Sequence, residues 1–141
     1  MPIRVLVADD HPLMRESMVA LLASQEDLEV VGQAASGVEV LELVATLAPD
    51  VIVMDVRMPE MDGIEATRRL TASGAPARVV GVSAEAHDTV RERLVQAGAT
   101  TLVSKEDLFE QLLPAIRAAA APKKKRGTTP PRGPRGRKGR R

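Results

Sequence analysis

Five short apolar runs alternate along the chain with longer segments of helical periodicity. The runs consist almost continuously of Val, Ile, Leu and Ala, which is typical of parallel strands that are covered on both faces. We expect strands at residues 3–8, 29–34, 51–54, 78–82 and 101–103. Because a helical segment follows each strand, the pattern predicts a (βα)5 chain with a parallel sheet between two layers of helices.

The segments between the strands have apolar positions three or four residues apart, as amphipathic helices do. The positions that share one face are Met14, Met18, Leu21 and Leu22 in the first segment, and Leu108, Leu112, Ala115, Ile116 and Ala119 in the last. Pro12 suits the first turn of the first helix. Asp107 and Glu110 fit a capping box at the start of the last helix. Gly74 and Gly98 stand where helices are expected to end.

Carboxylates follow two of the predicted strands. Asp9 and Asp10 come directly after the first strand, and Asp55 comes directly after the third. Two strand orders are common for such a sheet. The flavodoxin-like, doubly wound order 2-1-3-4-5 places strands one and three side by side, with the ligand site beyond their carboxyl ends. We predict this five-stranded order, because it is the one that brings the three carboxylates together.

The three carboxylates would repel one another unless they shared protons or held a cation. Oxygen ligands in a chain without cysteine favour a hard cation, and Mg²⁺ is the cofactor that we expect. A second interpretation is that Asp10 caps the helix that begins near Pro12. His11 is a candidate ligand or general base, although an isolated histidine is more often neither.

Asp55 is the candidate nucleophile, because a carboxylate can attack phosphorus and form an aspartyl phosphate. Ser83 and Lys105 follow the fourth and fifth strands, so they fall on the same edge of the sheet. A hydroxyl and an ammonium group are suitable partners for a phosphoryl group. The alternative is that these are ordinary strand-end residues, since Asp and Ser are common in turns. Lys105 is nevertheless the only lysine in residues 1–121.

Charge divides the chain into two parts. Residues 1–121 contain 10 basic and 19 acidic residues, whereas residues 122–141 contain 10 basic and no acidic residues. We therefore expect one folded domain over residues 1–121 and a disordered, basic, Pro- and Gly-rich tail or linker remnant over residues 122–141. The absence of cysteine suits the cytoplasm, and neither a signal peptide nor a membrane span is expected.

Three interpretations of the basic tail are open. The tail could bind nucleic acid or another polyanion without sequence specificity, by neutralising phosphates. It could fold back on the acidic domain. It could be a plain linker or a remnant left after loss of an output domain, which is the interpretation that we favour. With one Phe and no Tyr or Trp in the chain, recognition by base stacking is unsupported.

With these residues identified, the chain resembles the receiver domain of two-component response regulators over residues 3–120. The resemblance rests on Asp9-Asp10, on Asp-Val-Arg-Met-Pro-Glu-Met-Asp-Gly at 55–63, on Val-Ser-Ala at 82–84 and on Lys105. The sequence Asp-Asp-His-Pro-Leu-Met-Arg at 9–15 resembles the LuxR/NarL/FixJ-like branch. That branch usually has a C-terminal helix-turn-helix domain, and we expect no such domain in residues 122–141.

The resemblance implies a phosphoacceptor switch in phosphorelay signal transduction, not an enzyme with an external product. Asp55 would accept the phosphoryl group of a sensor histidine kinase, and Ser83 and Lys105 would contact it. The implied ligands of Mg²⁺ are Asp9, Asp10, Asp55 and the backbone carbonyl of Arg57. The implied output is control of transcription in the cytoplasm. A homodimer that forms on phosphorylation is a further expected partner.

The chain departs from the family pattern in two further places. Leu102 stands where the family has a switch aromatic in strand five, and Glu106 rather than proline follows Lys105, so we expect no cis peptide there. Leu102 motivates an alternative function, a receiver-like interaction module that works without phosphorylation. A phosphatase with an aspartate nucleophile is the remaining alternative, and it would need a second acid/base group and a substrate pocket.

Overall fold

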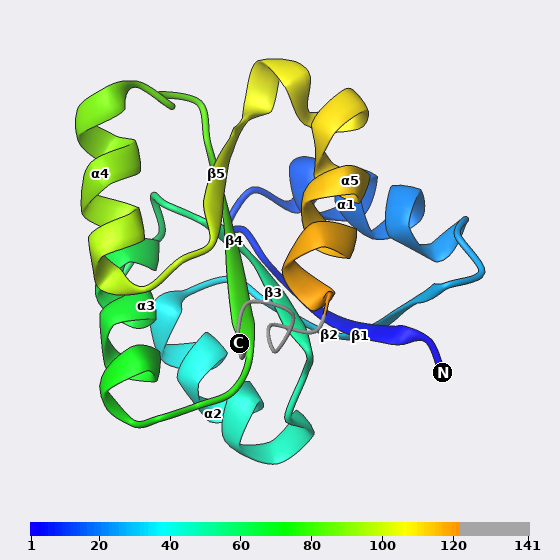
Figure 1. The fold of residues 1–141 in the computed structure, drawn as a ribbon, viewed down its shortest axis with the longest axis horizontal. Helices are drawn as coiled ribbons and strands as arrows, with labels where there is room; N and C mark the ends of the chain where they lie inside the picture. The colour runs from blue at the N-terminus through cyan, green and yellow to red at the C-terminus, as the bar shows by residue number, and fades with distance from the viewer. Residues whose placement is uncertain (122–141) are drawn as a thin grey trace, which may run out of the picture.

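The computed structural model describes residues 1–121, and residues 122–141, on which the expected tail falls, lie outside the described part. The strands are β1 Ile3–Ala8, β2 Leu28–Ala34, β3 Val51–Asp55, β4 Arg78–Ser83 and β5 Thr101–Ser104. They form one sheet of order β2-β1-β3-β4-β5 in which every pair is parallel (Figure 1). The predicted flavodoxin-like topology is confirmed.

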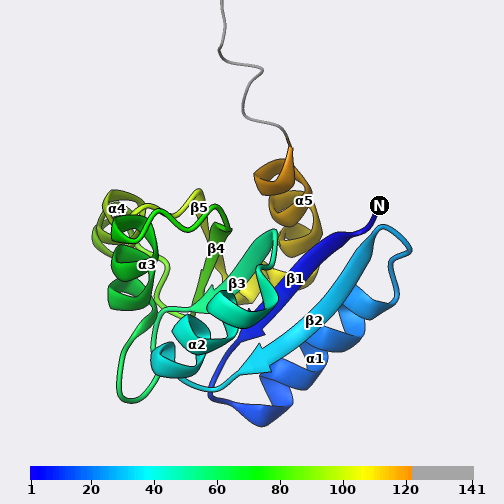
Figure 2. The same ribbon diagram turned by 90° about the horizontal axis from the view of Figure 1, so that it is seen from below.

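Helices cover both faces of this sheet. They are α1 Pro12–Ala23, α2 Gly37–Leu47, α3 Gly63–Ala72, α4 Asp88–Ala97 and α5 Leu108–Ala120, with the short 3-10 turn η1 Lys105–Asp107 between β5 and α5. Helices α1 and α5 lie on one face and α2, α3 and α4 on the other (Figure 2). Among residues 1–121, no helix has the length and apolar character that a membrane span requires.

Alternate residues of each strand supply two apolar cores. On β1, Val5 and Val7 point towards α1 and α5, whereas Leu6 and Ala8 point towards α2, α3 and α4. This two-sided burial explains why the strands are continuously apolar in sequence. The helical faces predicted for α1 and α5 are confirmed by the burial of Met18, Leu22, Leu108, Leu112, Ile116 and Ala119.

Three strands extend one residue further than the sequence predicted, and β2 begins one residue earlier, at Leu28. The residues added at the ends of β3, β4 and β5 are Asp55, Ser83 and Ser104. They are polar and still pair within the sheet, Asp55 with Val82 and Ser83 with Ser104. Two of the candidate site residues, Asp55 and Ser83, are therefore held by the sheet itself and not by a loop. A rigid sheet is the more accurate support for a chemical site.

The helix boundaries combine confirmed predictions with one error. Pro12 lies in the first turn of α1, and Gly74 and Gly98 follow α3 and α4 with φ angles of 77° and 123°. The capping box predicted at Asp107 and Glu110 is wrong, because the Asp107 side chain makes no capping hydrogen bond. The turn η1 leads the chain into α5 instead, so Asp107 does not adopt the extended conformation of a capping residue.

Candidate functional site

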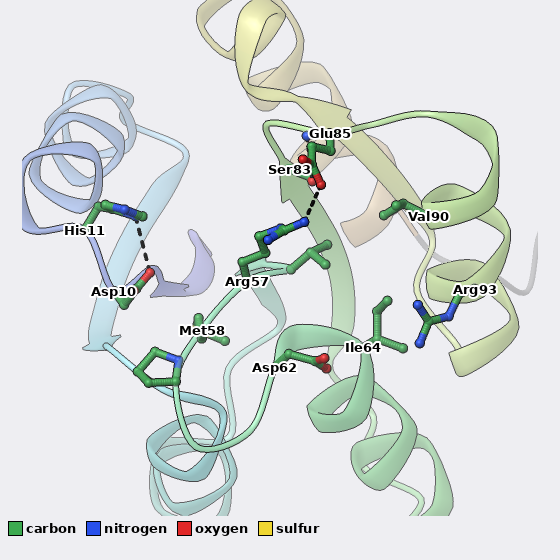
Figure 3. A pocket seen from close by; sticks show the side chains of 12 residues that line it. Asp10, His11, Arg57, Met58, Asp62, Ile64, Ser83, Glu85, Val90 and Arg93 are labelled. Atoms are coloured by element: carbon green, nitrogen blue, oxygen red, sulfur yellow. Dashed lines mark hydrogen bonds and ion pairs between the residues drawn. The ribbon is translucent and has the colours of Figure 1, made fainter.

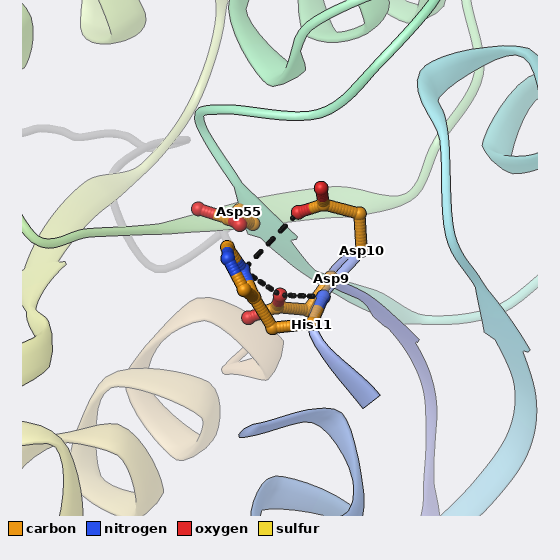
Figure 4. Close-up of side chains that lie close together, drawn as sticks. All are labelled: Asp9, Asp10, His11 and Asp55. Atoms are coloured by element: carbon orange, nitrogen blue, oxygen red, sulfur yellow. Dashed lines mark hydrogen bonds and ion pairs between the residues drawn. The ribbon is translucent and has the colours of Figure 1, made fainter. Parts of the chain in front are cut away.

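Three carboxylates meet where two central strands end. Asp55 is the last residue of β3, and Asp9 directly follows β1. The sheet register pairs Ala8 with Met54, so the next residue of each strand lies at the same edge. Asp9 and Asp55 are buried, with 0% and 2% of their surface exposed. Asp10 joins them from the following loop, as Figure 4 shows.

Backbone contacts hold Asp9 in place. Its N–H donates to the carbonyl of Ala34 at 3.0 Å, and its own carbonyl accepts a hydrogen bond from the Arg15 guanidinium at 2.7 Å. Its Oδ1 atom accepts a hydrogen bond from the His11 N–H at 2.8 Å. One oxygen of the Asp9 carboxylate is thus engaged by the start of α1, and the other points towards Asp55 and Lys105.

Lys105 is the cation of this cluster. Its Nζ atom lies 3.4 Å from Asp9 Oδ2 and 3.5 Å from Asp55 Oδ2. Burial, and after it the negative charge of Asp9, raise the pKa of Asp55 to about 6. The charge of Lys105 and the nearby N–H of Arg57 oppose this increase. The pKa of Asp55 remains high because the Lys105 ammonium and the Arg57 N–H do not compensate for burial and for the charge of Asp9.

The carboxylate oxygens fit a bound cation. Within residues 1–121, Asp9 Oδ2, Asp10 Oδ1 and Asp55 Oδ2 are buried and take part in no hydrogen bond. Buried oxygens of this kind are costly unless another group satisfies them. A cluster of carboxylate oxygens suits a hard divalent cation such as Mg²⁺. The alternative that Asp10 caps α1 is wrong, because the N-cap residue of α1 is His11 and its side chain makes no capping hydrogen bond.

Ser83 and a nearby ion pair line a cavity next to the carboxylates. Ser83 is 3% exposed, and its Oγ accepts a hydrogen bond from the Glu85 N–H at 3.0 Å. The cavity has a volume of about 520 Å³, and Asp10, Arg57 and Arg93 also line it (Figure 3). Arg57 and Glu85 form an ion pair across it.

The side chains of Arg57 and Glu85 were missed from the sequence, which drew attention only to the Arg57 carbonyl. A signal was present, because Arg57 and Glu85 each stand two residues after a predicted site residue, Asp55 and Ser83 respectively. Neighbouring parallel strands place the loops that follow them side by side. Opposite charges at matching positions in two such loops indicate an ion pair across the site.

Leu102 lies outside this cluster. It is 3% exposed and belongs to the core beneath α2, α3 and α4. Its backbone carbonyl accepts a hydrogen bond from the Arg91 guanidinium of α4 at 2.9 Å. The residue at the expected switch position is thus a core aliphatic that is tied to α4 through its backbone.

The sequence and the fold both match known proteins. The family model for the response regulator receiver domain matches residues 5–117. The response regulator GacA of Pseudomonas aeruginosa is 44% identical over 119 residues, which cover 84% of this chain and 56% of that protein. The transcriptional regulatory protein LiaR of Bacillus subtilis is 37% identical over 118 residues, with the same coverage of 84% and 56%. The chain therefore spans little more than half the length of these relatives.

A solved structure shows the same fold. The signal receiver domain of the response regulator NarL from Mycobacterium tuberculosis superimposes with a TM-score of 0.81 and 34% sequence identity. The match covers 84% of this chain and 96% of that chain. The resemblance inferred from the Asp pair, the 55–63 segment and Lys105 is confirmed.

Proposed function

Because this chain belongs to the response regulator receiver domain family, we propose that it is a switch in which Asp55 accepts a phosphoryl group from a sensor histidine kinase. Receiver domains work with histidine kinases in two-component signalling. The observation that supports the role of Asp55 most directly is its setting. It is a buried carboxylate at a strand end, and its Oδ2 atom has no hydrogen bond and lies 3.5 Å from the Lys105 ammonium.

In the proposed reaction, an Asp55 carboxylate oxygen attacks the phosphorus atom of the phosphohistidine. A P–O bond forms while the P–N bond breaks, and its electron pair leaves with the imidazole, which takes a proton from solvent. The product is an acyl phosphate on Asp55 itself. The chain thus catalyses only its own modification, and we propose no external substrate turnover.

We propose that the remaining site residues neutralise the charge of the phosphoryl group and hold it in position. Asp9, Asp10, Asp55 and the carbonyl of Arg57 would hold Mg²⁺, which supplies neutralisation of the phosphoryl oxygens when bound. Lys105 is close enough to Asp55 to pair with a phosphoryl group there. Ser83, at the neighbouring strand end, would donate its hydroxyl hydrogen to the same group.

Phosphorylation would then act on an existing conformational equilibrium. The added charge forms contacts with Ser83 and Lys105 that the free carboxylate does not make in the same way, so it favours one of two states. We propose that α4, β5 and α5 transmit this change, that a homodimer is one of the assemblies it favours, and that the output is control of transcription in the cytoplasm. The names of the relatives GacA and LiaR support a regulatory output.

The domain division also belongs to this proposal. Residues 1–121 would form the complete phosphoacceptor unit, with residues 122–141 as a basic tail or linker. The tail's 10 basic residues, without an acidic one, also suit non-specific polyanion binding as a second role.

The decisive experiment is intact-mass spectrometry after incubation with Mg²⁺ and acetyl phosphate, a small phosphodonor. We expect a single phosphoryl adduct on the wild type and none on Asp55→Asn. Asp50→Asn is the matched control. Asp50 is exposed and directly precedes the start of β3, at the opposite end of the strand from Asp55, so this substitution should leave the adduct unchanged.

The absence of an adduct on a wild type that still binds Mg²⁺ would overturn the proposed reaction. It would favour the alternative, an interaction module that works without phosphorylation. An adduct that persists on Asp55→Asn would remove Asp55 from its assigned role. Steady release of phosphate from a phosphomonoester would instead indicate a phosphatase.

A further inference from the structure

The group that the proposed phosphoacceptor role does not use is the imidazole of His11. The His11 ring lies beside the carboxylates of Asp9 and Asp10, as Figure 4 shows. Its Nδ1 atom is 3.4 Å from Asp9 Oδ1 and 3.3 Å from Asp10 Oδ1. One ligand atom from each of Asp9, Asp10, His11 and Asp55 can be chosen so that all four lie within 4.8 Å of one another. A single cation can therefore be reached by three carboxylates and one imidazole nitrogen.

The backbone directs this ring towards the site. His11 is the N-cap residue of α1, yet its side chain makes no capping hydrogen bond. Its N–H is anchored to Asp9 Oδ1 at 2.8 Å. The side chain remains 69% exposed, so it can adjust by small rotations towards a cation without disturbing a packed core. The buried oxygens Asp9 Oδ2 and Asp55 Oδ2 have no hydrogen bond and share the single Lys105 ammonium at 3.4 and 3.5 Å, which leaves capacity for a cation there.

An imidazole ligand changes which cation a site prefers. Mg²⁺ binds oxygen ligands and seldom takes nitrogen, whereas first-row transition dications accept imidazole readily. For a mixed nitrogen and oxygen site, the affinity rises from Mn²⁺ through Co²⁺ to Ni²⁺. A fourth ligand of this type would therefore add affinity for transition dications and little for Mg²⁺.

We propose that His11 Nδ1 is a ligand of the cation site and makes it select first-row transition dications over Mg²⁺. This inference rests on the proposed function only in that it uses the same carboxylates. Phosphorylation of Asp55 needs a bound dication of either kind, so the function does not require the histidine. The assignment makes His11 a residue that determines the specificity of the metal site.

The test compares three forms of the full chain: wild type, His11→Gln and His87→Gln. Glutamine offers an amide oxygen but no imidazole nitrogen. His87 is the matched control, because it is the other histidine of the chain, is exposed, and stands at the N-cap of α4 without a capping hydrogen bond. Dissociation constants for Ni²⁺ and for Mg²⁺ are measured by isothermal titration calorimetry, with circular dichroism to confirm that each variant is folded.

We expect His11→Gln to weaken Ni²⁺ binding about tenfold or more while Mg²⁺ binding changes by less than about twofold. His87→Gln should bind both cations as the wild type does. A spectroscopic readout is available with Mn²⁺ as the probe. Electron spin echo envelope modulation of the bound Mn²⁺ should contain a directly coupled imidazole nitrogen in the wild type and in His87→Gln, and none in His11→Gln.

The outcomes separate this proposal from the proposed function. Equal loss of Ni²⁺ affinity in both histidine variants, an unchanged selectivity in His11→Gln, or a wild-type Mn²⁺ spectrum without nitrogen coupling would overturn the role of His11. In each of these cases, an adduct from acetyl phosphate would leave the phosphoacceptor function intact. A wild type that binds no divalent cation would overturn both proposals.

Discussion

At the scale of single residues, Asp55 combines two requirements that oppose each other. A nucleophile that accepts a phosphoryl group must be ionised, yet Asp55 is buried beside two other carboxylates. Burial and the charge of Asp9 both favour the protonated form and raise its pKa to about 6. A bound dication and Lys105 would restore the ionised form. In the absence of a cation, the site therefore destabilises the folded state.

This opposition predicts how stability depends on pH. The pKa of Asp55 is raised from 3.8 to about 6. Between these values the folded state binds more protons than the unfolded state, so the free energy of unfolding falls as pH rises through this window. We expect Asp55→Asn to stabilise the cation-free protein by about 1–3 kcal/mol at pH 7, with a gain that shrinks towards pH 4.

The measurement is urea denaturation of both proteins across this range with a chelator present. Asp50→Asn serves as the control, because Asp50 is exposed and no gain is expected from its substitution. A stabilisation by Asp55→Asn that is equal at pH 4 and pH 7 would contradict the explanation, since it could not arise from titration of the carboxyl group.

Lys105 gives a second prediction at this scale. Its ammonium lies 3.4 Å from one carboxylate and 3.5 Å from another, so it repels a cation that binds between them. We expect Lys105→Ala to bind Mg²⁺ about three- to tenfold more tightly at low ionic strength, with a smaller effect at high salt. The same variant should still take up phosphate but show a weaker conformational response, because the phosphoryl group loses its partner.

Calorimetric titration with Mg²⁺ tests the first part, and the change in hydrogen exchange on phosphorylation tests the second. Lys105→Arg keeps the charge and should retain the wild-type affinity for Mg²⁺. An affinity of Lys105→Ala for Mg²⁺ equal to that of wild type would show that the ammonium does not act on the cation site.

At the scale of elements, the close approach of α3 to the end of β3 positions Asp55. A Cβ atom at Gly63, the first residue of α3, would lie 2.3 Å from the backbone oxygen of Asp55. The Gly63 N–H donates to the carbonyl of Val56 at 2.9 Å, which closes the loop between the two elements. The glycine is thus required by proximity to the site backbone.

We predict that Gly63→Ala destabilises the fold by about 1–3 kcal/mol and slows phosphoryl uptake, because the backbone at Asp55 must move. Gly32→Ala is the matched control, since the atom nearest to a Cβ there, at 2.8 Å, is the flexible end of Leu47. Its cost should stay below about 1 kcal/mol, with uptake unchanged. Chemical denaturation and the rate of adduct formation measure the two effects, and equal behaviour of the two variants would argue against this account.

The elements also show what a sequence can and cannot predict. The strand order could be predicted from the sequence, and so could the edge of the sheet where Asp9, Asp55 and Lys105 meet. Strands that are buried on both faces must be apolar along their length, so the charged residues that follow them mark where each strand ends. The failed capping box at Asp107 depended on the path between β5 and α5, which η1 determines. The Arg57–Glu85 ion pair depended on the conformation of two loops. The conformation of a loop depends on tertiary contacts, which a local sequence pattern does not predict.

At the scale of the whole molecule, the site and the end of the described part of the chain lie at opposite ends of the strands. α5 begins beside η1, next to Lys105, and runs back along the sheet. Its last residues, Ala119 and Ala120, line a cavity with Ile3 and Asp50, which are near the starts of β1 and β3. Ala121, the last described residue, therefore directly follows a helix end that lies at the opposite ends of the strands from Asp55.

This arrangement predicts that the basic segment 122–141 is not needed for phosphorylation. A chain of residues 1–121 should form the acetyl phosphate adduct at a rate within about twofold of the full chain at physiological ionic strength, because salt screens charges separated by more than about 8 Å. Time-resolved intact-mass spectrometry of both proteins provides the comparison. A large loss of uptake in the shorter chain would place the segment at the site.

A salt-dependent affinity for DNA that only the full chain shows would assign the basic segment 122–141 a separate role, because phosphate neutralisation by its 10 basic residues depends on ionic strength.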